Sequence, residues 1–104
     1  MKVRKGSVKI TDARGTARLA PDLCKIGPEV VVRINRKKKT IELMHWWNGH
    51  RPDLTMWAPH ERARIRKIHL GRLIRELGLC PKEMVGQEYR ATIKNGVIRI
   101  NLKS

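Results

Sequence analysis

The stretch YRATIKNGVIRINL, residues 89–102, decides the fold because it predicts a β-hairpin with a single register. Asn95-Gly96 is the preferred sequence for a two-residue type I′ turn, and apolar residues alternate with polar ones on both sides of it. The inward pairs in this register are Ile93 with Ile98, Ala91 with Ile100 and Tyr89 with Leu102. The outward face is largely basic and carries Arg90, Thr92, Lys94, Arg99 and Asn101.

A second hairpin is predicted at Ser7 to Ala20, with residues 12–15 as its loop. The pairs in this register are Thr11 with Thr16, Ile10 with Ala17, Lys9 with Arg18 and Val8 with Leu19. Lys9 and Arg18 then lie side by side on the outward face, beside Arg14 of the loop, and like charges placed opposite each other cost stability. This face is therefore either a solvated face or one that contacts an anion.

A third hairpin is predicted at Val30 to Met44, with a loop of two or four residues within Arg36 to Lys39. Its register pairs Ile34 with Ile41 and Val32 with Leu43 inward, and Arg33 with Glu42 outward. The tip carries four adjacent cations, which are Arg36, Lys37, Lys38 and Lys39. Such a tip either touches phosphates without base selectivity or protects an exposed sheet edge.

Between the last two of these hairpins along the chain, the segment from about Pro59 to Leu77 predicts one long amphipathic helix, with Pro59 near its first turn and Gly78 as its stop. Its apolar residues are Ile65, Ile68, Leu70, Leu73, Ile74 and Leu77, and its cations are Arg62, Arg64, Arg66, Lys67, Arg72 and Arg75. The cations are either solvated side chains on a core helix or contacts to a phosphate backbone. Gly71 costs helix stability, which close packing against a strand would explain.

These elements predict an α+β fold, in which three antiparallel β-hairpins surround one long amphipathic helix. The 104 residues form a single domain, 1–104. It consists of a hairpin pair at residues 7–44, an irregular Trp-rich connection at 45–59, and the helix plus the C-terminal hairpin at 60–104.

The charge indicates a polyanionic partner, because 24 Lys and Arg against 9 Asp and Glu give a net charge of +15. Residues 1–44 hold 12 basic and 4 acidic residues and residues 45–104 hold 12 and 5, so the charge belongs to the folded unit rather than to a tail. No apolar stretch approaches the length of a membrane span, and no signal peptide is evident. We therefore expect a cytoplasmic protein without a membrane partner.

Enzyme chemistry is not indicated by the sequence. The four histidines, His45, His50, His60 and His69, lack the paired spacing of a metal site, and the acidic residues are scattered singly. Cys24 and Cys80 stand apart, which is typical of buried thiols in a reducing compartment. We expect no catalytic residue, no metal and no cofactor.

Three tryptophans, Trp46, Trp47 and Trp57, lie around the central connection and hold most of the aromatic mass. Either they fill the core beneath that connection, or they form a stacking platform for unpaired bases beside residues such as Arg51. Exposed tryptophans would favour RNA or single strands, whereas buried ones would leave duplex DNA contacted by basic strands and turns.

The first half, roughly residues 7–44, resembles the AbrB/SpoVT-type swapped-hairpin domain. The similar features are a turn with Gly15, a strand closing in Leu19-Ala20-Pro21, a short segment ending in Ile26-Gly27, and a final strand pair. The resemblance implies a swapped-hairpin barrel formed by a homodimer that binds duplex DNA, mainly through Arg14 and also through Arg18. Leu73 to Leu79 ends in a similar Leu-Gly-Leu, so an internal duplication would let one chain imitate the dimer.

The sequence thus predicts a nucleic-acid-binding protein, with a small duplex-DNA-binding transcriptional regulator of AbrB-like type as the first hypothesis. An RNA-binding or ribosome-associated protein is the alternative, and an interaction module for an acidic protein partner is a further one. The candidate binding residues are Lys9, Arg14, Arg18, Arg36, Lys37, Lys38, Lys39, Arg62, Arg66 and Arg72.

Overall fold

The computed structural model describes residues 4–21, 23, 29–46, 53–58, 62 and 64–102. These residues form mostly antiparallel sheet with two short helices. In chain order the elements are β1 (Arg4–Ile10), β2 (Thr16–Leu19), β3 (Glu29–Asn35), β4 (Thr40–His45), β5 (Leu54–Thr55), β6 (Arg66–His69), α1 (Gly71–Glu76), α2 (Pro81–Met84), β7 (Glu88–Lys94) and β8 (Val97–Asn101).

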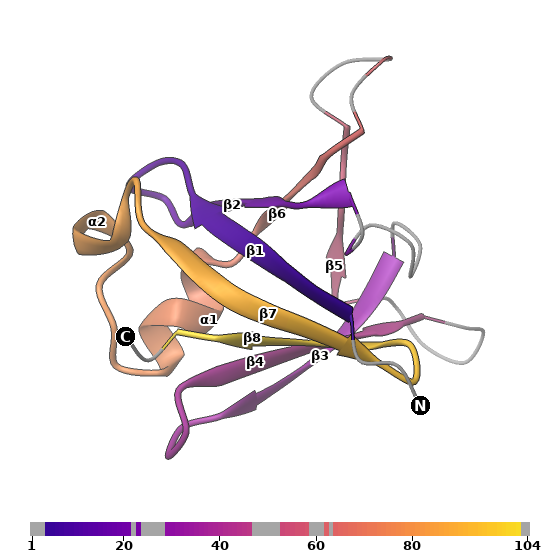
Figure 1. Ribbon diagram of the computed structural model, residues 1–104. Helices are drawn as coiled ribbons and strands as arrows, with labels where there is room; N and C mark the ends of the chain where they lie inside the picture. The colour runs from indigo at the N-terminus through magenta and orange to yellow at the C-terminus, as the bar shows by residue number, and fades with distance from the viewer. Residues whose placement is uncertain are drawn as a thin grey trace.

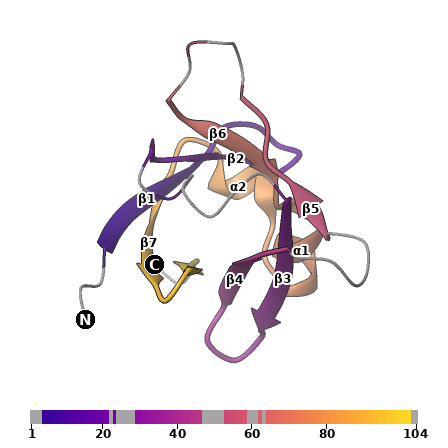
Figure 2. The ribbon, with the colours of Figure 1, turned by 90° about the vertical axis from the view of Figure 1, so that its right-hand side faces the viewer.

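The strands form one sheet that curls into a nearly closed barrel. Their order in the sheet is β5-β3-β4-β8-β7-β1-β2-β6. The two edges meet where Trp57, just after β5, and Lys67 of β6 exchange backbone hydrogen bonds of 2.9 and 2.8 Å. Figures 1 and 2 show the strands around the barrel interior, with α1 and α2 next to each other at one end.

The ring of strands is unchanged when the two halves of the chain are exchanged. Replacing β1 by β5, β2 by β6, β3 by β7 and β4 by β8, and the reverse, reproduces the same order of neighbours, including the bridge between β5 and β6. The inward pairs at the β4–β8 junction also exchange, since Ile41 pairs with Ile100 and Leu43 with Ile98. An internal duplication predicts such an arrangement.

The predicted fold class is wrong, although the registers inside its three hairpins are confirmed. The Lys9–Arg18, Arg33–Glu42 and Ile93–Ile98 pairs occur as predicted in β1–β2, β3–β4 and β7–β8. The β3–β4 turn has the four-residue form. In place of hairpins around a long helix, the hairpins pair with one another, β1 with β7 and β4 with β8, to form the barrel wall.

The long helix predicted from Pro59 to Leu77 is also wrong. Its middle, Arg66–His69, is strand β6, which pairs along its whole length with β2, and helix begins only at Gly71. Ile68 and Leu70 point into the core two residues apart, so this stretch carries the period of a strand as well as that of a helix. Pairing with β2 decides between the two periods. The predicted start, residues 59–61, lies outside the described residues.

The predicted irregular connection, residues 45–59, contains an element that the sequence did not indicate. Leu54–Thr55 is strand β5, which pairs with the beginning of β3 through Glu29 and Val30. Residues 47–52 and 59 lie outside the described residues. The connection therefore supplies one edge of the sheet.

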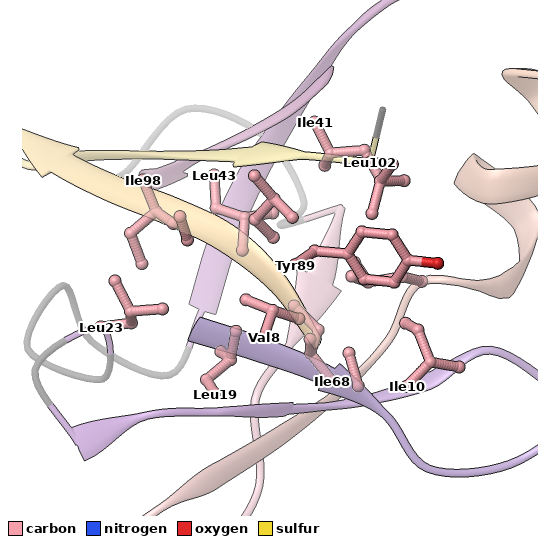
Figure 3. Packing of buried hydrophobic residues seen from close by; sticks show 14 of the residues in the cluster. Val8, Ile10, Leu19, Leu23, Ile41, Leu43, Ile68, Tyr89, Ile98 and Leu102 are labelled. Atoms are coloured by element: carbon pink, nitrogen blue, oxygen red, sulfur yellow. The ribbon is translucent and has the colours of Figure 1, made fainter. Parts of the chain in front are cut away.

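One hydrophobic cluster fills the barrel. Side chains from seven strands, all except β5, supply its fully or almost fully buried members, among them Val8, Leu19, Leu43, Ile68 and Ile98. Figure 3 shows part of this cluster. Burial of a side chain of this size contributes about 1.5–3 kcal/mol, so the cluster is the main source of stability. Successive side chains of a strand point to opposite faces of the sheet, so the chain neighbours of a buried strand residue lie on the outer face of the barrel.

The β1–β2 turn packs directly on the start of α1. A Cβ on Gly71 would lie 1.9 Å from the carbonyl oxygen of Arg14, and a Cβ on Gly15 would lie 2.4 Å from Cα of Gly71. The amide of Leu70 donates a 3.0 Å hydrogen bond to the carbonyl of Gly15. Close packing thus explains Gly71, with a turn as the partner where a strand was predicted.

Candidate nucleic-acid interface

Three cations lie in a row across the outer face of β1, β2 and β6. Lys9 pairs with Arg18, and Arg18 pairs with Lys67. Their chain neighbours Val8, Ala17 and Ile68 are fully buried, so these three side chains face outward. Directly opposed residues in antiparallel strands have Cβ atoms about 4.5–5.5 Å apart. We call Lys9, Arg18 and Lys67 the basic row.

No carboxylate lies between the cations of the basic row. The ion pairs given by the described residues are Arg72–Glu76 at 3.4 Å and Arg99–Glu42 at 3.2 Å, and neither includes the row. Glu88 lies opposite Lys9 at one end, in β7. Adjacent like charges destabilise a sheet, so this arrangement stores repulsion that an anion along the row would relieve.

An aromatic pair lies at the other end of the basic row. Trp57 pairs with Lys67 across the closing bridge, and its ring lies against that of His69, with centroids 4.5 Å apart and planes tilted by 40°. Trp57 is half-buried and His69 is exposed. His69 Nδ1 lies 3.2 Å from the hydroxyl of the buried Thr16, a hydrogen bond that orients the imidazole. The row therefore continues from cations to a partly exposed ring surface.

His69 also lines a hollow of about 260 Å³ between the β3–β5 side of the barrel and α1. The apolar lining residues are Val32, Ile34, Leu54 and Leu73, and the polar ones are Asp53, His69, Arg72 and Glu76. Asp53 Oδ2 accepts a 2.8 Å hydrogen bond from the amide of Val32, which ties this lining to β3. The hollow is slightly smaller than the roughly 300–1,000 Å³ of sites for small molecules, so it suits a single planar group.

The structure brings together only some of the predicted binding residues. Lys9 and Arg18 are neighbours in the basic row. Arg66, half-buried, pairs with Leu19 and so alternates away from the row, and Arg72 reaches the hollow instead. Arg62 is exposed, and no contact places it with the others.

Arg14 is exposed in the β1–β2 turn, at the end of the strands that carry Lys9 and Arg18. Asp12 shapes that turn, because its Oδ1 accepts hydrogen bonds from the amides of Arg14 at 3.0 Å and Thr16 at 3.1 Å. The Thr16 amide, with smaller contributions from Arg14, holds the pKa of Asp12 below its ordinary value. The aspartate is thus ionised at neutral pH and fixes the turn beside Arg14.

The cationic tip of the β3–β4 hairpin is not part of the basic row. Strands β3 and β4 lie on the opposite side of the ring from β1 and β2. Arg36, Lys37 and Lys38 are exposed, whereas Lys39 is half-buried and its Nζ donates a hydrogen bond to the carbonyl of Leu77. Lys39 therefore binds the C-terminal end of α1, and its predicted contact with a phosphate stays a prediction.

Sequence reasoning missed Lys67, Trp57 and His69 as parts of one surface. The sequence predicts Lys67 on a helix, offers His69 only as a possible metal ligand, and offers Trp57 as a stacking residue beside Arg51 rather than beside Lys67 and His69. The alternation of polar and apolar residues in Arg66–His69 is the signal that would have put Lys67 and His69 on the outer face of a strand.

Other chemistry finds little support in the described residues. No group of three His, Cys, Asp or Glu side chains within them lies close enough to hold a metal ion. Cys80 is exposed, which corrects the expectation of a buried thiol, and Cys24 lies outside the described residues. No helix in the part of the chain that the structure describes has the length and apolarity to cross a membrane.

Fold and surface together define a class of molecule: a small, nearly closed antiparallel barrel whose outer face carries a row of cations beside an aromatic pair. No family model matches the chain, and neither curated proteins nor solved structures provide a match.

Proposed function

We propose that this protein binds nucleic acid through the outer face of β1, β2 and β6, where the basic row contacts the phosphate backbone. The observation that carries the proposal is the juxtaposition of Lys9, Arg18 and Lys67 on three neighbouring strands, with no carboxylate between them and Glu88 opposite Lys9 at one end. Stability alone disfavours the two like-charge pairs Lys9–Arg18 and Arg18–Lys67, because like charges directly opposite each other destabilise a sheet. The net charge of +15 supports the same partner, because a polyanion relieves self-repulsion over the whole surface.

The binding role is non-enzymatic in this proposal, and it is carried out in the cytoplasm. Phosphate contacts position a nucleic acid but do not identify its bases, so the basic row by itself supports affinity rather than sequence specificity. Arg14 is exposed in the turn between β1 and β2, and the proposal includes it as a further cation at the end of these strands. A duplex bound across β1 and β2 would use Arg14 together with Arg18, as the resemblance to swapped-hairpin proteins implies.

The proposal is tested by removing equal charge from two places. One variant carries Lys9→Gln, Arg18→Gln and Lys67→Gln, and the control carries Arg36→Gln, Lys37→Gln and Lys38→Gln at the exposed β3–β4 tip. Binding of labelled single-stranded and duplex oligonucleotides is measured by fluorescence anisotropy at several salt concentrations.

We expect the basic-row variant to lower the slope of log K against log salt by about 2 on single strands and slightly more on duplexes, since each phosphate contributes about 0.7 or 0.9. The tip variant should change this slope less, because its residues lie across the barrel. Equal losses in both variants, or no loss in the basic-row variant, would refute the proposed surface. Equal competition by polyglutamate would instead favour an acidic protein partner.

A further inference from the structure

We propose that the nucleic acid is a single strand, one base of which stacks on the ring pair of Trp57 and His69. This inference rests on the proposed function, and it adds what kind of strand the surface accepts. The aromatic pair directly continues the basic row, because the backbone of Trp57 is hydrogen-bonded to that of Lys67. Cations followed by a ring surface form the combination by which proteins hold unpaired nucleotides.

The path along this surface crosses four neighbouring strands. Lys9, Arg18 and Lys67 lie on β1, β2 and β6, and Trp57 lies across the closing bridge. Neighbouring strands are about 4.8 Å apart, so the path from Lys9 to Trp57 is roughly 14 Å. That length accommodates the backbone of a few nucleotides, with phosphates beside the cations and a base at the rings.

A duplex cannot use the aromatic pair in this way. Each base inside a duplex is already stacked on both faces, whereas an unpaired base presents a free face to aromatic side chains. His69 is exposed and Trp57 is half-buried, so the pair offers ring surface at the outside of the barrel. The protein pays for this ring exposure in hydrophobic stabilisation, which a stacked base would recover.

The hollow beside His69 supplies polar groups for the edge of the same base. Arg72 and Glu76 are held together by an ion pair of 3.4 Å at its lining, and Asp53 faces it from the β3–β5 side. These side chains include both donors and acceptors, which recognise the Watson–Crick edge of an unpaired base. The size of the hollow, about 260 Å³, suits one base rather than a longer ligand.

The test compares strands that have the same phosphates but different bases. A labelled single-stranded RNA, the matching DNA, abasic versions of both, and the matching duplex are titrated against the full chain at one salt concentration. We expect the natural strands to bind roughly tenfold more tightly than their abasic counterparts, and more tightly than the duplex, as expected for one stacked base. The RNA and DNA arms show whether the 2′-hydroxyl contributes.

Substitutions then assign this preference to the rings. Trp57→Leu should abolish the preference for natural over abasic strands, and Trp57→Phe should restore most of it, with the salt slope unchanged in both. Because Trp57 itself forms the closing bridge, the exposed His69 provides a second variant: His69→Ala should reduce the preference and His69→Phe should keep it. Thermal midpoints of all four variants show whether a loss reflects unfolding.

The two proposals fail in different ways. If natural and abasic strands bind equally while the basic-row variant still loses affinity, the single-strand proposal is overturned and the proposed function stands. Tighter binding of the duplex has the same meaning. If no polynucleotide binds, or if basic-row substitutions leave binding unaltered, the proposed function itself is overturned.

Discussion

At the scale of single residues, Gly71 illustrates how a contact between backbones selects an amino acid. It begins α1, where glycine lowers helix stability relative to alanine by about 0.5–1 kcal/mol. The carbonyl of Arg14 occupies the space that a Cβ would need. Glycine is therefore favoured here by the β1–β2 turn, although the helix itself disfavours it.

We predict that Gly71→Ala destabilises the protein by about 1–3 kcal/mol or more, which is opposite in sign to the usual effect of this substitution in a helix. The reason is that the turn and α1 must move apart, since both contacting atoms belong to backbone. The control is Arg72→Ala on the exposed side of the same helix, which should cost less than about 0.5 kcal/mol. Urea denaturation measures both, and a stabilised Gly71→Ala variant would contradict the packing described.

Residue-scale prediction from the sequence worked where a local pattern decided the outcome. Lys9 and Arg18 were expected side by side because the turn between them sets the register, and they are side by side. Lys67 joins them only through the pairing of β2 with β6. Arg18 and Lys67 are 49 residues apart in the sequence, so no local pattern predicts their contact. Two thirds of the basic row was therefore accessible from the sequence.

At the scale of elements, the β3–β4 tip divides its four cations between two roles. Lys39 has a positive φ of 55°, and its ammonium group binds the carbonyl of Leu77 at the end of α1. A cation at this place also complements the negative end of the helix dipole. The tip thus anchors a hairpin to a helix from the other half of the chain.

We predict that Lys39→Ala destabilises the protein by about 0.5–1.5 kcal/mol, the net value of one hydrogen bond. Lys38→Ala, at the exposed neighbouring position, should leave stability within about 0.5 kcal/mol of the wild type. Alanine and lysine bear a similar cost at positive φ, so the difference reports the side chain. Thermal unfolding monitored by circular dichroism distinguishes the pair, and equal midpoints would show that the contact contributes nothing.

The predicted long helix, which the structure replaces with β6 and α1, shows why the type of an element was only partly predictable. The spacing of Ile65, Ile68 and Leu73 fits one face of a helix. The spacing of Ile68 and Leu70 fits a strand whose alternate side chains face the core. Short segments with both periods are decided by their partners, and the partner here is β2. The two strands of a hairpin are neighbours in the sequence and are joined by a short turn, so their registers were predictable. The partner of β6 is distant in the sequence, so β6 was not predictable.

At the scale of the whole molecule, the barrel is closed more weakly at one junction than at the others. β4 and β8 pair through five residues each, whereas the junction between the β5 and β6 edges is the single Trp57–Lys67 bridge. The ring pair that we propose as a stacking site lies at this junction. Local opening of a barrel is easiest where the fewest hydrogen bonds must break.

We predict that the amides of Trp57 and Lys67 exchange with solvent at least about tenfold faster than the bonded amides between β4 and β8. Opening at the bridge requires only two backbone hydrogen bonds to break, whereas opening at β4–β8 disrupts the centre of the core. Hydrogen exchange followed by NMR measures both sets in one sample. Equal protection would show that the bridge opens only on global unfolding.

The closed ring was not predictable from the sequence, because the pairings that close it join distant parts of the chain. The pairs β1–β7, β2–β6 and β4–β8 each link one half with the other, and neither turn residues nor periodicity specify them. The predicted α+β arrangement followed from treating each hairpin as complete in itself. The basic outer faces of those hairpins were foreseen, but the order in which they stand around the barrel was not.

This interleaving has a consequence for synthesis of the chain. When the ribosome has made β1 to β4, two hairpins exist whose β1 and β4 edges will later be covered by β7 and β8. Until the C-terminal hairpin emerges, those edges can pair only with each other or with foreign strands, and such intermediates are prone to aggregate. The barrel can therefore close only after β7 and β8 have been made and inserted between the first two hairpins.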